Sequence, residues 1–357
     1  MANIMRMNNT ERISKESMKR DPYWDTLKFI LIFCVVLAHC LGGYKPAGGM
    51  NLALYNFLLT FLMPTFIFVS GMFSQIKDRK KYKRGILRIF ETYAVFQLIR
   101  AVPPMLISGK VTIMSVASVI GGPRVTLWYL LSLVFWRLMV YFMPEKLLRD
   151  NPIRIIVGCF LISLLGGFVP IDSQFSLQRT ITYLPFFFMG HYAMNIDVKK
   201  YVAKIPPLLA VGVLLSVFLL IFFLFNIHLN VVLMGKSSYW FNSNYSPLLL
   251  CFGRLVFLFS AIITGTMVMR LVMIKPVFPE WGKLTLFIYI YHSFLIQTMR
   301  FAQRNGYLPH EGWIGYAMAV FITGILIYLS RVKFFNILLN PVSYLMEIIK
   351  PANNKRV

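Results

Sequence analysis

Apolar residues occur along this chain in long blocks separated by short polar stretches, and the blocks have the length of membrane-spanning helices. A helix needs about 20 mainly apolar residues to cross the hydrocarbon core of a bilayer. We predict ten such segments, at residues 26–44, 51–73, 86–107, 125–143, 153–170, 180–196, 207–227, 247–273, 284–300 and 312–331. The pattern therefore predicts an all-α, polytopic membrane protein with about ten transmembrane helices.

These segments follow one another without a Pro- or Ser-rich linker, and no second, soluble domain is indicated. We therefore expect a cytoplasmic N-terminal segment over residues 1–25, one transmembrane domain over 26–331 and a cytoplasmic C-terminal tail over 332–357. The first apolar segment is expected to stay in the protein, because no small-residue cleavage site follows it.

Composition supports the membrane assignment and excludes other classes of protein. Of the 357 residues, 58% are hydrophobic and only 14% are charged, which is too little charge for the surface of a soluble domain. The net charge of +24 would suggest nucleic-acid binding in a soluble protein, but here the basic residues lie between apolar segments, so no nucleic-acid partner is expected. The 4 cysteines contain no C-x-x-C pair, so neither a metal site nor a disulfide framework is indicated.

The basic residues also predict the orientation. With the N-terminus in the cytoplasm, 25 of the 37 Lys and Arg residues fall in connections on the cytoplasmic side and 8 on the opposite side. Such a bias is the positive-inside pattern of multi-pass proteins. With an even number of spans, both termini are then cytoplasmic.

The first segment carries three ionisable side chains at helical spacing. Lys28 and His39 are eleven residues apart, which is about three turns and about 16 Å along a helix, so they share one face. Asp25 lies on nearly the same face, one turn before Lys28. Ionisable groups inside a membrane are costly and usually mark a functional site. The alternative is that His39 only caps the outer end of the helix, beside Gly42 and Gly43.

Further ionisable residues fall within later segments. They are Arg88, Glu91, Arg137, Arg254 and His292. Lipid cannot accommodate so many polar groups, so we predict a polar cavity inside the bundle. Trp128, at the start of the fourth segment, suits an interfacial anchor, but Arg137 nine residues deeper has no such explanation.

A basic stretch at residues 75–93 follows the second segment. It contains Lys81, Arg84 and Arg88. Topology alone accounts for the basic loop, but Arg88 lies one turn inside the third segment. It either pairs with Glu91 or faces a polyanion at the cytoplasmic mouth, since the arginine fork binds two phosphate oxygens at once.

Four motifs in this order resemble the acyltransferase family 3 membrane proteins. The first is the basic residue, ten residues and histidine of Lys28 and His39. The others are Met63-Pro64 with Ser70-Gly71, Trp128-Tyr129-Leu130, and the late Gly282, Thr285-Leu286, Tyr289 and His292. The opening RDPYWDTLKF looks closest to the fucose 4-O-acetylase-like branch. Two features depart from the family pattern: Arg84 and Arg88 are not spaced R-x-x-R, and Glu91-Thr92-Tyr93 stands where Ile-Pro-Tyr often occurs.

The resemblance implies an O-acyltransferase that moves an acyl group, usually acetyl, to a hydroxyl of an extracytoplasmic, cell-envelope glycan. Acetyl-CoA would be the donor substrate, with no tightly bound cofactor and no metal. His39 would act as general base or as a transient acyl carrier. The side chains expected to bind the donor or line the cavity are Asp25, Lys28, Lys81, Arg84, Arg88, Trp128, Arg137 and His292. The transfer would occur within the bundle, or the acyl group would pass to a separate esterase-like protein.

Two other classes remain alternatives. A transporter or flippase of a polar or anionic substrate would also need ten spans, a polar interior and a basic loop after the second segment. Against it, the chain shows no pair of matching halves. A non-catalytic scaffold would not need ionisable groups within the membrane.

Overall fold

The computed structural model describes residues 21–43, 49–107, 119, 121–123, 126–171, 174–224, 234–241, 245–309 and 311–349. Throughout this part of the chain the regular structure is helical, without strands. Residues 1–20 of the expected N-terminal segment and residues 350–357 of the expected tail lie outside it.

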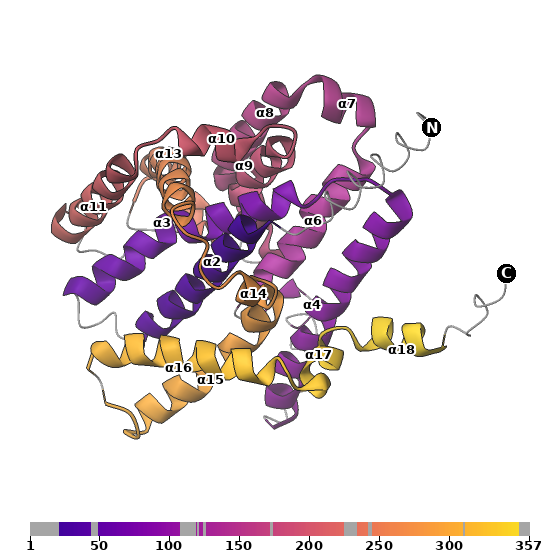
Figure 1. Cartoon of the computed structure of the whole chain (residues 1–357), viewed down its shortest axis with the longest axis vertical. Coiled ribbons are helices and arrows are strands. Elements are labelled where there is room, and N and C mark those ends of the chain that lie inside the picture. Colours follow the sequence, from indigo (N-terminus) through magenta and orange to yellow (C-terminus); the bar gives the residue numbers. More distant parts are fainter. Residues whose placement is uncertain are drawn as a thin grey trace, which may run out of the picture.

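Ten helices of at least 14 residues occur in the described residues, one for each predicted apolar segment (Figure 1). They are α2 (Pro22–Leu41), α3 (Gly49–Met72), α4 (Arg79–Ile107), α6 (Trp128–Phe142), α8 (Pro152–Leu165), α9 (Leu177–Ala193), α11 (Pro207–Leu224), α13 (Pro247–Val272), α15 (Thr285–Arg304) and α16 (Trp313–Leu329). Shorter helices connect or follow them: α7 (Glu145–Asp150), α10 (Val198–Ala203), α14 (Pro279–Gly282), α17 (Lys333–Leu339) and α18 (Pro341–Ile349).

Fewer of these helices meet the requirements for a membrane span by length and apolar character alone. Among the described residues three do so, α2, α3 and α13, and a fourth is counted if α16 and α17, which are bent by 94° relative to each other, form one span. Helices α6, α8 and α11 are apolar but shorter. Helices α4 and α15 carry charged side chains that lower their hydropathy. The protein is thus an all-helical membrane protein, and ten spans remain a prediction.

Helix α2 lies in the middle of the bundle and begins at a strong start signal. Asp21 accepts a hydrogen bond from the backbone N–H of Tyr23 at 3.0 Å, and Pro22 occupies the first helical position, where its missing N–H is harmless. The helix packs against α3, α13, α14, α15 and α16. Its central position places the polar face of the helix, from Asp25 and Lys28 at one end to His39 at the other, inside the protein.

Helices α3 and α9 cross at very short range. Added Cβ atoms on Gly71 and Gly190 would overlap the carbonyl oxygens of Phe187 and Phe68 respectively, so each glycine faces the backbone of the other helix. Small residues allow such close approach within membranes. The Ser70-Gly71 pair of the sequence therefore has a packing role.

Helix α17 lies beside α4, and α18 follows it and extends away from α4 (Figure 1). The two carboxylate oxygens of Glu91 accept hydrogen bonds from the backbone N–H groups of Val342 and Ser343, at 2.6 and 3.1 Å, and from the Ser343 hydroxyl. Glu91 thus caps the N-terminus of α18, a favourable site for a negative charge. The 332–349 part of the expected tail is consequently attached to the helical domain.

Candidate active site

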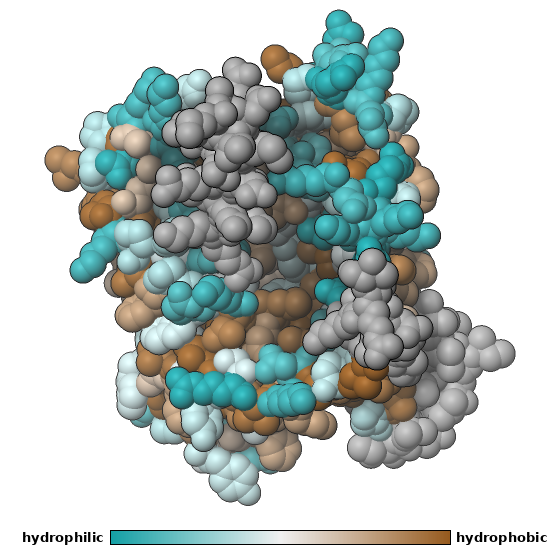
Figure 2. All heavy atoms as spheres, turned by 45° about the vertical axis from the view of Figure 1, so that its right-hand side comes forward, coloured by the Kyte–Doolittle hydropathy of each residue, from teal (hydrophilic) through white to brown (hydrophobic). Residues whose placement is uncertain are grey.

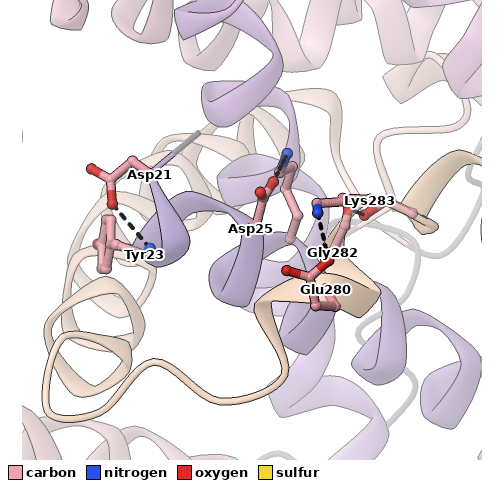
Figure 3. Close-up of polar contacts among 8 residues, drawn as sticks. Asp21, Tyr23, Asp25, Glu280, Gly282 and Lys283 are labelled. Atoms are coloured by element: carbon pink, nitrogen blue, oxygen red, sulfur yellow. Dashed lines mark hydrogen bonds and ion pairs between the residues drawn. The ribbon is translucent and has the colours of Figure 1, made fainter. Parts of the chain in front are cut away.

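The Asp25–Lys28 pair forms the first part of the site, near the N-terminus of α2. Lys28 Nζ lies 2.6 Å from Asp25 Oδ1, with Asp25 buried and Lys28 partly exposed. Residues three apart share a helix face, so the helix itself brings the pair together. Figure 3 shows Asp25 beside Gly282, whose Cβ position would overlap the Asp25 backbone, with Glu280 and Lys283 on the same short helix segment. Packing against α14 therefore fixes this end of α2.

A cavity of about 770 Å³ adjoins this pair, between α2, α3, α6 and α15. Its volume is within the usual range of small-molecule sites. Three cationic side chains line it, Lys28, Lys77 and Arg137, together with the carboxylates of Asp21 and Asp25. Arg137 is held by a hydrogen bond from its Nε to the Ser74 hydroxyl at 3.2 Å. Asp25 pairs with Lys28 and Asp21 with Lys199, so Lys77 and Arg137 leave a positive charge beside apolar walls, which suits a ligand that carries phosphate.

Two tyrosines form the inner end of this cavity. The Tyr129 hydroxyl is 2.5 Å from the Ser70 hydroxyl, and the Tyr129 and Tyr289 rings are 5.4 Å apart. Tyr289 donates a hydrogen bond to the Thr126 carbonyl oxygen. These bonds satisfy the polar groups of both rings deep in the bundle, and they fix the rings in place.

His39 and His292 lie beyond these tyrosines, near the other end of α2. Their ring centroids are 5.3 Å apart, and the Tyr289 ring is 6.0 Å from His292. Arg300 Nη2 donates a hydrogen bond to the backbone oxygen of His39 at 3.0 Å. The basic cavity is thus connected to the histidine pair through one tyrosine of α15.

The protonation of His292 follows from its hydrogen bond. Its Nδ1 is 3.0 Å from the carbonyl oxygen of Ile288, which can only accept, so Nδ1 carries the proton of a neutral ring. The other ring nitrogen, Nε2, is buried and has no hydrogen-bond partner among the described residues. A lone pair beside His39 is therefore free to accept a proton or a hydrogen bond.

A second cavity, of about 620 Å³, lies between α3, α8, α9, α10 and α13. Its walls are mostly apolar, and the ionisable side chains on them are Arg149, Tyr192 and Tyr201. None of the residues predicted for chemistry lines it. We therefore assign the candidate active site to the first cavity and the histidine pair.

The predicted site residues are distributed over three places. Asp25, Lys28 and Arg137 line the basic cavity, and His39 and His292 form the pair beyond it. Trp128 lies near the histidine end, stacked on Tyr183 at 5.6 Å. The third place is the exposed surface of α4, which holds Lys81, Arg84 and Arg88 outside the lining of the cavity.

Sequence reasoning missed several residues of this site. Lys77 was treated only as part of the basic loop, and Tyr289 only as part of a motif. Three arginines near the histidine pair, Arg100, Arg179 and Arg300, were counted as outer-side charges. The available signal was their position: Arg100 and Arg300 fall inside the predicted segments 86–107 and 284–300, and Arg179 directly precedes the segment 180–196. The described residues contain no cluster of three or more His, Cys, Asp or Glu side chains suited to a metal ion.

Comparison with known proteins identifies the family of the chain. Residues 21–330 match acyltransferase family 3, described as an acyltransferase domain, over most of the chain. No curated protein and no solved structure shows significant similarity to the chain. The family match includes the Lys28–His39 helix, the basic cavity and the histidine pair, so this protein belongs to acyltransferase family 3 and is a membrane acyltransferase.

Proposed function

We propose that the protein is an O-acyltransferase that moves an acyl group, acetyl in the simplest case, from cytoplasmic acyl-CoA to a hydroxyl of an extracytoplasmic glycan. The observation that carries this proposal is the connection between the basic cavity and the histidine pair through Tyr289. One end suits a phosphate-bearing donor. The other has groups that can accept the proton of an alcohol.

The proposed donor site is the cavity that contains Lys28, Lys77 and Arg137. The phosphates of acyl-CoA would bind these cations, with the thioester directed towards Tyr129 and Tyr289. For the thioester to reach His39, the bond between the Tyr129 and Ser70 hydroxyls and the bond from Tyr289 to the Thr126 carbonyl oxygen would have to break, so that the two rings can turn aside. Lys81, Arg84 and Arg88 lie on the exposed first turns of α4, where they would attract the polyanionic donor through long-range electrostatics.

His39 is the proposed catalytic residue. As general base it would remove the proton of the acceptor hydroxyl while that oxygen bonds to the acyl carbonyl carbon. The bond between this carbon and sulfur then breaks, and the proton passes to the departing CoA thiolate. As a transient carrier, a ring nitrogen of His39 would instead bond to the acyl carbon while the bond to sulfur breaks, and CoA would leave as the thiol with the ring proton. The acceptor oxygen would then bond to the acyl carbon as the bond to nitrogen breaks, and the hydroxyl proton would return to the His39 ring. In both cases the His292 Nε2 lone pair would orient the His39 ring.

The proposed topology has all ten long helices crossing the membrane and both termini in the cytoplasm. The distribution of Lys and Arg along the sequence supports it, and so does the surface: in Figure 2, hydrophilic side chains are concentrated towards the upper part of the view. In this orientation the basic cavity opens to the cytoplasm, where acyl-CoA is made. His39 lies towards the opposite face, where the glycan is.

Sealed vesicles containing the purified protein test this function. Acetyl-CoA labelled in the acetyl group is supplied on the side exposing the N-terminus, and a glycan is enclosed on the other. We expect label on the glycan and free CoA outside. Passage of intact acetyl-CoA or of glycan without any thioester cleavage would favour the transporter alternative. Label that stays on the protein until an esterase-like protein is added would identify a relay.

The donor site makes a separate prediction. Lys28→Gln and Arg137→Gln should each raise the KM for acetyl-CoA about tenfold or more, because a hydrogen bond to a charged group contributes about 1.5–3 kcal/mol. The Arg84→Gln/Arg88→Gln double variant should raise it only a few-fold, and the effect should disappear at high salt. Steady-state CoA release at varied donor concentration measures both.

Lys204→Gln is the matched control, since Lys204 is exposed and lies outside the lining of the cavity. Its KM should equal that of the wild type. A larger rise in KM for the Arg84/Arg88 variant than for the cavity variants would show that the donor binds at the surface of α4 and not in the cavity.

A further inference from the structure

Three arginines from three different helices surround the histidine pair. Arg100 is on α4, Arg179 on α9 and Arg300 on α15, and all three are partly buried. They lie near the helix ends on the His39 side of the bundle. The proposed transfer mechanism does not use any of them.

Arg100 is the most incompletely satisfied of the three. Its Nη2 donates to the hydroxyl of Ser293, the residue next to His292, and its guanidinium lies 3.9 Å from the centre of the Phe294 ring. Its Nε and Nη1 are buried without hydrogen-bond partners in the described structure. Leaving charged donors unsatisfied is costly, so this site favours an additional acceptor.

Arg179 and Arg300 extend the positive region around the same point. The Arg179 guanidinium lies 4.7 Å from the Trp128 ring centre, in the neighbourhood of Tyr289 and Tyr55. Arg300 binds the His39 carbonyl oxygen and is also near Tyr55. The neighbourhood of Tyr55 and Tyr289 therefore contains all three guanidinium groups.

Carboxylates do not neutralise this cluster within the described residues. The ion pairs found there are Lys28–Asp25, Arg79–Glu145, Arg149–Asp150, Lys199–Asp21 and Lys283–Glu280. All of these lie at the opposite end of the helices. On the histidine side, the carboxylate in the described connections is Glu311, which is exposed.

Structural roles account for only part of this arrangement. Arg300 binds the C-terminal end of α2, where a cation is favourable, and Arg179 gains from its contact with Trp128. Neither role explains the two unsatisfied nitrogens of Arg100. Guanidinium groups arranged around a point without carboxylates are typical of oxyanion recognition, because each planar fork binds two oxygens.

We propose that Arg100 and Arg179, assisted by Arg300, bind an anionic group of the acyl acceptor, a carboxylate or a phosphate carried by the glycan. This inference rests on the proposed function and names its substrate class: an acidic glycan in preference to a neutral one. The anion would hold the acceptor so that a neighbouring hydroxyl faces His39. The donor phosphates are excluded as occupants, because Lys28 lies about three helical turns from His39.

Binding without donor tests the proposal directly. The full-length protein in nanodiscs is titrated with three oligomers of matched length: an oligogalacturonate, a glycerol phosphate oligomer and a neutral malto-oligosaccharide. We expect at least one anionic oligomer to bind tenfold or more tightly than the neutral one, with an affinity that falls as salt rises. The better of the two anionic oligomers distinguishes carboxylate from phosphate.

Variants then locate the binding site. Arg100→Gln and Arg179→Gln should each weaken the anionic oligomer about tenfold while leaving CoA binding unchanged. Arg304→Gln is the matched control, one turn beyond Arg300 and exposed, and should behave as wild type. Equal binding of neutral and anionic oligomers by the wild type, or unchanged selectivity in both variants, would overturn the proposal. Loss of thioester cleavage with retained anion selectivity would contradict only the acyltransferase function.

Discussion

Replacing His39 with alanine is expected to lower acyl transfer by about 10³-fold or more while leaving acyl-CoA binding intact. General base or covalent catalysis by one side chain contributes roughly 10²–10⁴-fold, and the nearest comparable group is His292, whose Nδ1 is engaged with Ile288. The donor cavity is lined by other residues, so its affinity should not change. Single-turnover release of CoA and a CoA-dependent thermal shift measure the two quantities separately.

Cys34→Ala provides the matched control, because Cys34 lies on the same helix and lines no part of the donor cavity. It should retain wild-type turnover. If His39→Ala keeps full activity and His292→Ala loses it, the chemistry belongs to α15. Acetyl label that survives rapid denaturation of the wild type, and is absent from His39→Ala, would select the carrier role over the base.

Substituting Gly71 with alanine should lower the free energy of unfolding by about 3 kcal/mol or more. The added Cβ would overlap the carbonyl oxygen of Phe187, which is backbone and cannot rotate away. Overpacked sites usually cost about 1–3 kcal/mol, and a clash between two helix backbones belongs at the upper end or beyond. Helices α3 and α9 would have to separate. Thermal unfolding followed by tryptophan fluorescence in detergent reports the change.

Gly212→Ala is the appropriate comparison, because no atom lies within 4 Å of a Cβ built on this glycine of α11. Its melting temperature should stay close to that of the wild type, since an open site has nothing to clash with. Gly190→Ala, on the facing helix, should reproduce the loss seen at Gly71. Equal melting temperatures for Gly71→Ala and Gly212→Ala would mean that the helices do not cross at this glycine pair.

The apolar pattern predicted the helices well. Each of the ten segments corresponds to a helix, since an apolar run of this length has few alternatives in a membrane. The Lys28–Asp25 pair was also predictable, because spacing within one helix fixes which side chains share a face. Hydropathy could not establish the set of membrane spans, because charged side chains on α4 and α15 lower the apolar character of these two helices.

Contacts between helices could not be predicted from the sequence. Glu91 was considered as a partner of Arg88, yet it caps α18, some 250 residues along the chain. Arg100, Arg179 and Arg300 were counted as topological charges, because their convergence depends on how three separate helices pack. The pairing of His39 with His292 could be proposed from their similar depth, but the tautomer of His292 required the bond to Ile288.

The central position of α2 has a consequence for biogenesis. This helix leaves the ribosome first among those described, but four of its five packing partners, α13 to α16, are encoded about 200 residues later. During synthesis, α2 is therefore inserted into the bilayer before most of the helices that pack against it have been made. The Lys28–Asp25 pair neutralises its own charges in the meantime, within a single helix. Truncated chains that end before α13 would lack four of the five helices that pack against α2. We expect membrane quality control to degrade such chains even if their N-terminal helices insert correctly.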